Sequence, residues 1–184
     1  MDLLIDRLLP RPDFRTRYTR TIEAEPARVW TALHEVTFTE LPVTRLLMSI
    51  RSGGRAHLAG PVARTLPMPV LDQETGRELV VGRVAKFWRP VPVSGPESAA
   101  TLSGFAAFTE PGWAKAAMSF QLTPLADGRT LLAAETRVRA TDAAAWLRFA
   151  PYWLVIRVGG AGYIRLEMLR AVAHRAERER RGQG

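Results

Sequence analysis

The side chains best suited to catalysis or metal binding are few in this sequence and lie far apart. His34, His57 and His174 are the only histidines, and none has an i,i+4 or His-x-His partner of the kind that holds zinc. There is no cysteine, which excludes thiol nucleophiles, disulfides and thiolate-bound metal clusters. No serine occupies a Gly-x-Ser-x-Gly elbow, and no glycine-rich phosphate loop follows a strand pattern. We therefore expect neither a metal ion nor a cofactor.

Four polar residues are grouped in or beside two segments that have strand periodicity. They are Glu110, Lys115, Glu135 and Arg137. A buried Glu–Arg or Glu–Lys pair could orient a polar group on an apolar ligand, and a desolvated Glu could act as an acid or base. The same residues could instead form cross-strand charge pairs on the solvent face of a sheet. The register of the two strands decides between these alternatives.

The two segments, residues 113–125 and 130–141, are predicted to form a hairpin. A three-residue loop over 126–128, with Gly128 in the left-handed conformation, aligns the apolar faces of the two strands. A two-residue turn would shift the register by one residue and place apolar side chains beside charged ones. We therefore expect Met118 and Phe120 on the apolar face, with Glu135 and Arg137 on the opposite face, toward solvent.

The remaining patterns predict an α+β fold in one domain, 1–184, with an N-terminal extension over about 1–12 and a flexible basic tail over about 178–184. Pro26 and Pro42 suit the first turns of two short helices. Asp142 suits the N-cap of a long apolar helix that is kinked at Pro151 and interrupted over 159–162. Further strands are expected at 13–23, 68–72, 77–88 and 105–109, with an irregular connection over 53–67 and a last amphipathic helix from Tyr163.

Several segments resemble the START/SRPBCC superfamily, which includes polyketide cyclase/dehydrase-like proteins. They are Pro26-Ala27-Arg28-Val29-Trp30 directly after the first strand, and Asp127-Gly128-Arg129-Thr130 in a hairpin that feeds a long helix. Residues 108–117 and 135–142 look like segments of a bacterial branch of it, and the resemblance covers most of residues 10–175. It implies a helix-grip fold: a curved antiparallel sheet wrapped around a long, here broken, C-terminal helix, with two short helices after the first strand.

The resemblance also implies a cavity between the sheet and the C-terminal helix for lipids, polyketides or other apolar molecules. Inward-facing aromatic and methionine side chains are the candidates to line this cavity. Side chains of these types also pack together in ordinary hydrophobic cores, which is the alternative interpretation. The candidates are Trp88, Phe108, Trp113, Met118, Phe120 and Trp153. Binding of a small hydrophobic ligand is the leading hypothesis. The alternative is a cyclase/aromatase-like or hydrolase-like enzyme that uses Glu110, Glu135 or Arg137 in the cavity. The sequence leaves open whether the protein is an enzyme, and it favours ligand binding over catalysis.

The net charge of +8 raises nucleic acid or an anionic membrane as a weaker alternative. Nearly all of the 26 basic residues are arginines, Lys86 and Lys115 being the only lysines, and they are spread along the chain rather than clustered. We therefore do not expect a nucleic-acid partner. The acidic residues Asp2 and Asp6 argue against a signal peptide, and no apolar stretch is long enough to span a bilayer, so a cytoplasmic location is expected. The patterns leave the oligomeric state open.

Overall fold

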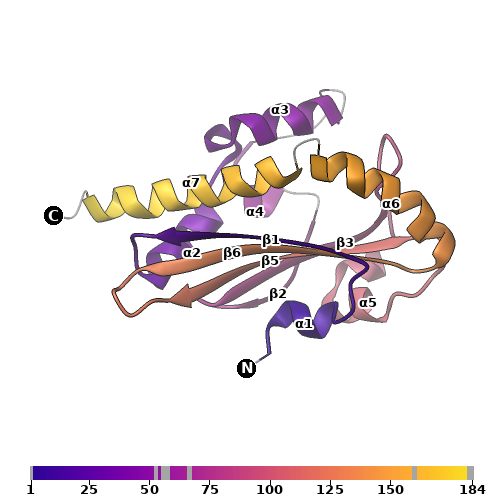
Figure 1. Ribbon diagram of the computed structural model, residues 1–184, viewed down its shortest axis with the longest axis horizontal. Coiled ribbons are helices and arrows are strands. Elements are labelled where there is room, and N and C mark those ends of the chain that lie inside the picture. The colour runs from indigo at the N-terminus through magenta and orange to yellow at the C-terminus, as the bar shows by residue number, and fades with distance from the viewer. Residues whose placement is uncertain (1, 52–53, 55–58, 66–67, 159–160, 182–184) are drawn as a thin grey trace.

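One antiparallel sheet of six strands forms the centre of the molecule (Figure 1). The computed structural model describes residues 2–51, 54, 59–65, 68–158 and 161–181. Along the sheet the strands follow the order β1-β6-β5-β3-β2, with β4 paired to β3. Their bounds are β1 Phe14–Ile22, β2 Val70–Glu74, β3 Glu78–Lys86, β4 Val93–Ser94, β5 Ala114–Pro124 and β6 Thr130–Ala140.

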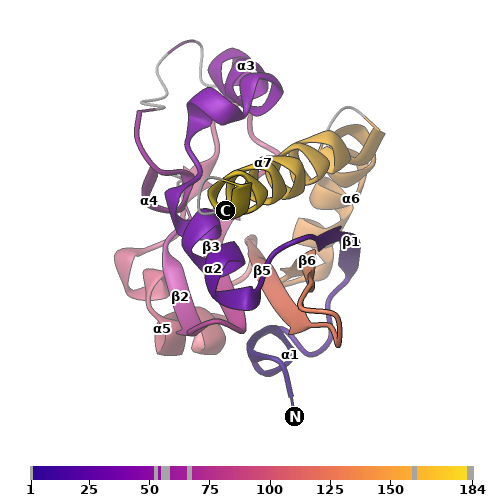
Figure 2. The same ribbon diagram turned by 90° about the vertical axis from the view of Figure 1, so that its left-hand side faces the viewer.

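Helices cover both faces of this sheet, but unequally. On the inner face lie α2 (Pro26–Glu35), α6 (Ala143–Val158) and α7 (Ala161–Arg181), with α3 (Pro42–Arg51) packed on α7 and α4 (Val62–Thr65) beside α2. The outer face carries the short helices α1 (Leu4–Leu8) and α5 (Leu102–Ala107) (Figures 1 and 2). Two 3-10 turns, η1 (Phe38–Glu40) and η2 (Glu97–Ala100), complete the elements. The curved sheet with a helix along its inner face is the predicted helix-grip arrangement.

The β5–β6 hairpin has the register that the apolar pattern predicted. Leu125 and Arg129 close a three-residue loop through a 2.8 Å hydrogen bond from the Leu125 N–H to the Arg129 carbonyl, and Gly128 has a φ of 77°. Phe120 is therefore paired with Ala134 and Met118 with Thr136. Because side chains alternate along a strand, even-numbered positions of both strands face the inner helices and odd-numbered positions face α1 and α5.

The break in the C-terminal helix is also as predicted, since α6 ends at Val158 and α7 begins at Ala161. Residues 159–160 lie outside the described residues. Asp142 caps α6 by accepting a 2.7 Å hydrogen bond from the Ala145 N–H. Pro151 lies inside α6, and the kink expected there stays a prediction. Of the predicted basic tail, 178–181 form the end of α7, while 182–184 lie outside the described residues.

The expectation of a strand over 105–109 is wrong. Thr101 accepts a 3.1 Å hydrogen bond from the Gly104 N–H and thereby begins α5, whose Phe105 is fully buried against the outer face of the sheet. The predicted irregular connection over 53–67 contains α4, while 52–53, 55–58 and 66–67 lie outside the described residues. Within the part of the chain that the structure describes, no helix is long and apolar enough to cross a membrane.

The segment predicted as an N-terminal extension contains α1, which is packed on the outer face of the sheet. Ile5 and Leu9 are buried there beside Val80 and Phe105. The carboxyl group of Glu78 accepts hydrogen bonds from the backbone N–H groups of Leu4 (2.7 Å) and Ile5 (3.2 Å) at the start of α1. It accepts a third, of 2.6 Å, from the Ser119 hydroxyl, so one buried side chain joins α1 to β3 and β5.

We predict that Glu78→Ala lowers the free energy of unfolding by about 2–3 kcal/mol, because it leaves buried donors of α1 and Ser119 without their acceptor. Urea denaturation followed by circular dichroism measures this loss. The control, Glu97→Ala at an exposed position, is expected to change stability by less than about 0.5 kcal/mol. Equal effects of the two substitutions would contradict the anchoring role of Glu78.

Candidate ligand-binding cavity

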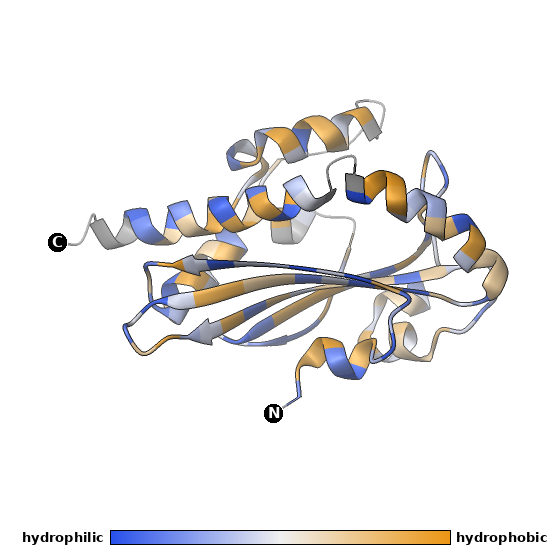
Figure 3. Cartoon of the chain, in the orientation of Figure 1, coloured by the Kyte–Doolittle hydropathy of each residue, from blue (hydrophilic) through white to orange (hydrophobic). Residues whose placement is uncertain are grey.

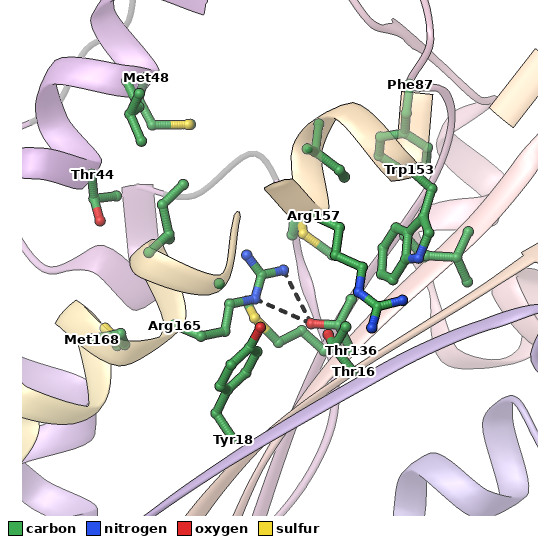
Figure 4. Close-up of a pocket in the computed structure, with 18 of the residues that line it drawn as sticks. Thr16, Tyr18, Thr44, Met48, Phe87, Thr136, Trp153, Arg157, Arg165 and Met168 are labelled. Carbon is green, nitrogen blue, oxygen red and sulfur yellow. Dashed lines mark hydrogen bonds between the residues drawn. The ribbon is translucent and has the colours of Figure 1, made fainter. Parts of the chain in front are cut away.

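A cavity of about 390 Å³ lies between the inner face of the sheet and helices α3, α6 and α7 (Figure 4). This volume falls in the range of small-molecule sites, which are mostly apolar with a few placed polar groups. The inward, even-numbered positions of three strands form its floor. They are Thr16 and Tyr18 of β1, Ala116, Met118 and Phe120 of β5, and Thr136 and Val138 of β6.

The walls come from the helices. On α6 the lining residues Phe149, Tyr152, Trp153 and Ile156 recur every three or four positions and so share one face of the helix. The Phe149 ring centroid lies 5.5 Å from that of Tyr152 and 5.9 Å from that of Trp153. The other contributors are Leu41, Thr44, Leu47, Met48, Val62, Met68 and Phe87, with Arg157 on α6 and Gly162, Ile164, Arg165 and Met168 on α7.

Helix α3 is held over the cavity by Glu167 of α7. The Glu167 carboxylate accepts hydrogen bonds from the N–H groups of Val43 (2.8 Å) and Thr44 (2.7 Å) and from the Thr44 hydroxyl (2.5 Å). A carboxylate at a helix N-terminus is favourable because the free N–H groups and the helix dipole both attract it. Leu46 and Ile50 of α3 and Leu154 of α6 are exposed to solvent. Figure 3 shows apolar residues along both helices.

One end of the cavity is polar. The Arg165 guanidinium donates from Nε (3.2 Å) and Nη2 (3.0 Å) to the Thr136 hydroxyl on the floor. Burial lowers the pKa of Arg165, and the phenols of Tyr18 and Tyr152 act in the opposite direction. Gly162 admits the Tyr18 hydroxyl close to the start of α7, since a Cβ at this position would lie 2.6 Å from the phenol oxygen.

The structure brings together part of the predicted lining. Met118, Phe120 and Trp153 line the cavity, and their contact with a ligand stays a prediction. Trp88 packs against the neighbouring cluster around Phe149 but does not line the cavity.

Phe108 and Trp113 are on the wrong face for the predicted role. Both belong to the outer cluster, where their ring centroids lie 6.1 Å apart in an edge-to-face arrangement. Trp113 stands an odd number of residues from Met118 and Phe120, so strand alternation turns it to the outer face. Phe108 follows α5, which occupies that same face.

None of the four polar candidates lines the cavity. For Lys115, Glu135 and Arg137, the strand register confirms the prediction that they face away from it. Their predicted exposure to solvent is wrong for three of them, because α1 and α5 cover this face and leave Lys115, Glu135 and Arg137 buried. The Lys115 ammonium donates to the Ala106 carbonyl of α5 at 2.9 Å, while Glu110 is exposed.

Glu135 is the centre of an ion-pair network on the outer face. Its carboxylate contacts Arg15 (2.7 Å), Arg17 (3.0 Å) and Arg137 (2.6 Å). Arg137 in turn donates to the Leu9 carbonyl (3.0 Å) and to Asp6 (2.6 Å), which ties the segment around α1 to β6. These charges serve the attachment of α1, and the cyclase-like alternative loses the residues on which it depended.

The polar end of the cavity was missed by the sequence analysis. Arg165 precedes Met168, Leu169 and Val172 at spacings of three, four and seven, so it lies on the apolar face of α7. A single basic residue on an otherwise apolar helical face was the available signal.

Among known proteins, this chain has distant similarity to solved structures. No family model and no curated protein matches the chain. A conserved protein from Geobacillus kaustophilus is similar over 90% of this chain and 96% of its own, with 13% identity and a TM-score of 0.43. A hypothetical protein from Helicobacter pylori is similar over 96% and 95%, with 6% identity and a TM-score of 0.43.

An aromatase/cyclase from Streptomyces sp. R1128 is similar over 93% of this chain and 98% of its own, with 12% identity and a TM-score of 0.35. No function is carried over from these proteins. The fold and the site themselves define the chain as a helix-grip domain that contains an apolar cavity with one polar end.

We predict that the stability due to Glu135 depends on pH. Burial alone would raise the pKa of this carboxyl, but hydrogen bonds from Arg15 and Arg137 outweigh burial and hold the pKa below its usual value. A lowered pKa in the folded state means that the stabilisation is complete above the ordinary carboxyl pKa of about 4.3 and is lost as the pH falls through the folded-state value. Glu135→Gln should therefore be most destabilising near neutral pH and progressively less so in acid.

Thermal unfolding of wild type and variant across this pH range measures the effect. Glu110→Gln, at an exposed position, is the matched control and should leave the pH profile unchanged. A constant difference between wild type and Glu135→Gln at all pH values would contradict the prediction.

Proposed function

We propose that the protein binds a small, largely apolar molecule in the cavity between the sheet and helices α3, α6 and α7. The observation that supports this most strongly is the cavity itself, about 390 Å³ lined by aromatic, aliphatic and methionine side chains. Protein interiors are normally packed as densely as organic crystals, so an apolar space of this size is a departure that a ligand would explain.

The chemistry of the lining favours binding over the cyclase-like alternative. The cavity presents the hydroxyls of Thr16, Tyr18 and Tyr152 and the guanidinium of Arg165. Among the residues that the structure describes, no histidine, aspartate or glutamate lines it. Hydroxyls and a guanidinium suit hydrogen bonding to a bound molecule, whereas general acid–base catalysis generally relies on His or carboxyl groups.

The START/SRPBCC resemblance agrees with this proposal. The segment at Pro26-Ala27-Arg28-Val29-Trp30 begins α2 directly after β1, and the hairpin at Gly128 leads into α6, which is the order that the resemblance implies. We propose that the chain is a member of it, folded as one domain over 1–184. In such a protein the space between sheet and C-terminal helix is the ligand site.

A cavity-filling substitution tests the proposal. Ala116 lies on the floor of the cavity, so Ala116→Phe should occupy the space and weaken binding of the neutral fluorescent probe N-phenylnaphthylamine at least about tenfold. Ala144→Phe makes the same change at an exposed position of α6 outside the lining and should bind the probe like wild type.

Fluorescence titration gives the affinities, and circular dichroism confirms that both variants fold. Equal probe affinity in Ala116→Phe and wild type, or no saturable binding to wild type, would overturn the proposal.

A further inference from the structure

One face of α6 is apolar and yet exposed to solvent. Leu147, Leu154 and Val155 are 67%, 62% and 68% exposed, and Pro151 between them is exposed as well. Because an α-helix has 3.6 residues per turn, these spacings place the four residues on one stripe along the helix. None of them lines the cavity, which is bordered by the opposite face of α6 around Ile156.

This stripe departs from the usual pattern of a surface helix, which pairs an apolar inner face with a polar outer face. The neighbouring Trp146 adds to it and is 42% exposed. Figure 3 shows apolar residues along the helix. An exposed group of large apolar side chains marks a surface that contacts a protein or a membrane.

The charged residues within α6 are two arginines, and they flank the stripe. Arg148 and Arg157 are both exposed, and helical geometry places them on opposite sides of Leu147, roughly 80–100° away around the axis. The sequence has no aspartate or glutamate over 143–158. The pKa of Asp142, just before the helix, is lowered most by its hydrogen bond from the Ala145 N–H and to a smaller extent by Arg148. The outward face of α6 is therefore apolar along its middle and cationic along both sides.

This combination fits the surface of an anionic membrane better than other partners. A helix in a membrane interface buries its apolar stripe among the headgroups, while flanking arginines reach the lipid phosphates. A closed dimer through this face would bring the arginines of two copies together, because the same patch meets itself. Nucleic acid presents phosphates, but it offers no apolar layer for the leucine and valine side chains.

We propose that the outward face of α6 docks on an anionic lipid bilayer. Leu147, Leu154 and Val155 enter the boundary between headgroups and acyl chains, and Arg148 and Arg157 contact the phosphates. The helix then lies in the plane of the interface, at the edge of the molecule where Figure 1 shows it. The docking does not depend on a ligand in the cavity, so it and the proposed function can fail separately.

Co-sedimentation with lipid vesicles measures the docking, using vesicles of phosphatidylcholine alone and vesicles that also contain phosphatidylglycerol. Wild type should bind the anionic vesicles at least about tenfold more tightly, because each arginine near the surface contributes. Leu154→Glu should weaken this binding at least about tenfold, since it removes a buried apolar side chain and adds a repelled charge. The matched control is Leu102→Glu, at an exposed position of α5 on the outer face, which should bind like wild type.

A second pair of variants tests the charge. Arg148→Gln should weaken binding to the anionic vesicles about fivefold, the loss expected for one basic residue near an anionic surface. Arg7→Gln makes the same change at an exposed position of α1, on the outer face of the sheet, and should bind like wild type. Circular dichroism verifies that all four variants fold.

Equal affinity of the wild type for the two kinds of vesicle would overturn the proposal, as would equal losses in Leu154→Glu and Leu102→Glu. Absence of vesicle binding would overturn it too. A dimer in analytical ultracentrifugation that Leu154→Glu dissociates would then assign this face to a second copy of the chain instead.

Discussion

The three-residue loop at Gly128 sets which side chains of β5 and β6 face the C-terminal helices, and the two faces of the sheet depend on it. With this register Met118, Phe120 and Thr136 point toward α6 and α7, while Ser119 and Glu135 point toward α1. A shift of one residue would bring the charges of Glu135 and Arg137 into the apolar cavity. The loop therefore separates an ionic face, which fastens the N-terminal helix, from an apolar face, which is available for a ligand.

The cavity exists because the inner face is covered by helices that do not fill it. The chain interrupts its C-terminal helix between Val158 and Ala161, so α6 and α7 cover different parts of the sheet. Glu167 fixes α3 to α7 and so holds the third wall at a distance from the floor. The same break places Gly162 against the Tyr18 hydroxyl and lets Arg165 reach Thr136, which gives the cavity its polar end.

Features that depend on periodicity were predictable from the sequence, and features that depend on packing were not. The hairpin register, the helix beginning at Pro26 and the interruption of the last helix follow from alternation, proline and glycine signals. The burial of Glu135 depends on α1, whose five residues are too few to show a helical period. Phe108 was expected within a strand over 105–109, whereas it directly follows the helix α5. Arg165 was not singled out because it is one of several arginines in the last helix.

The central claim, that an apolar molecule occupies the space between the sheet and α7, is tested most directly by crystallography with a bromine-labelled apolar probe such as 1-bromonaphthalene. Anomalous scattering locates the bromine atom. The account predicts the bromine near Met118, Phe120 or Trp153. An interior filled by side chains, or a bromine bound only outside this space, would contradict it.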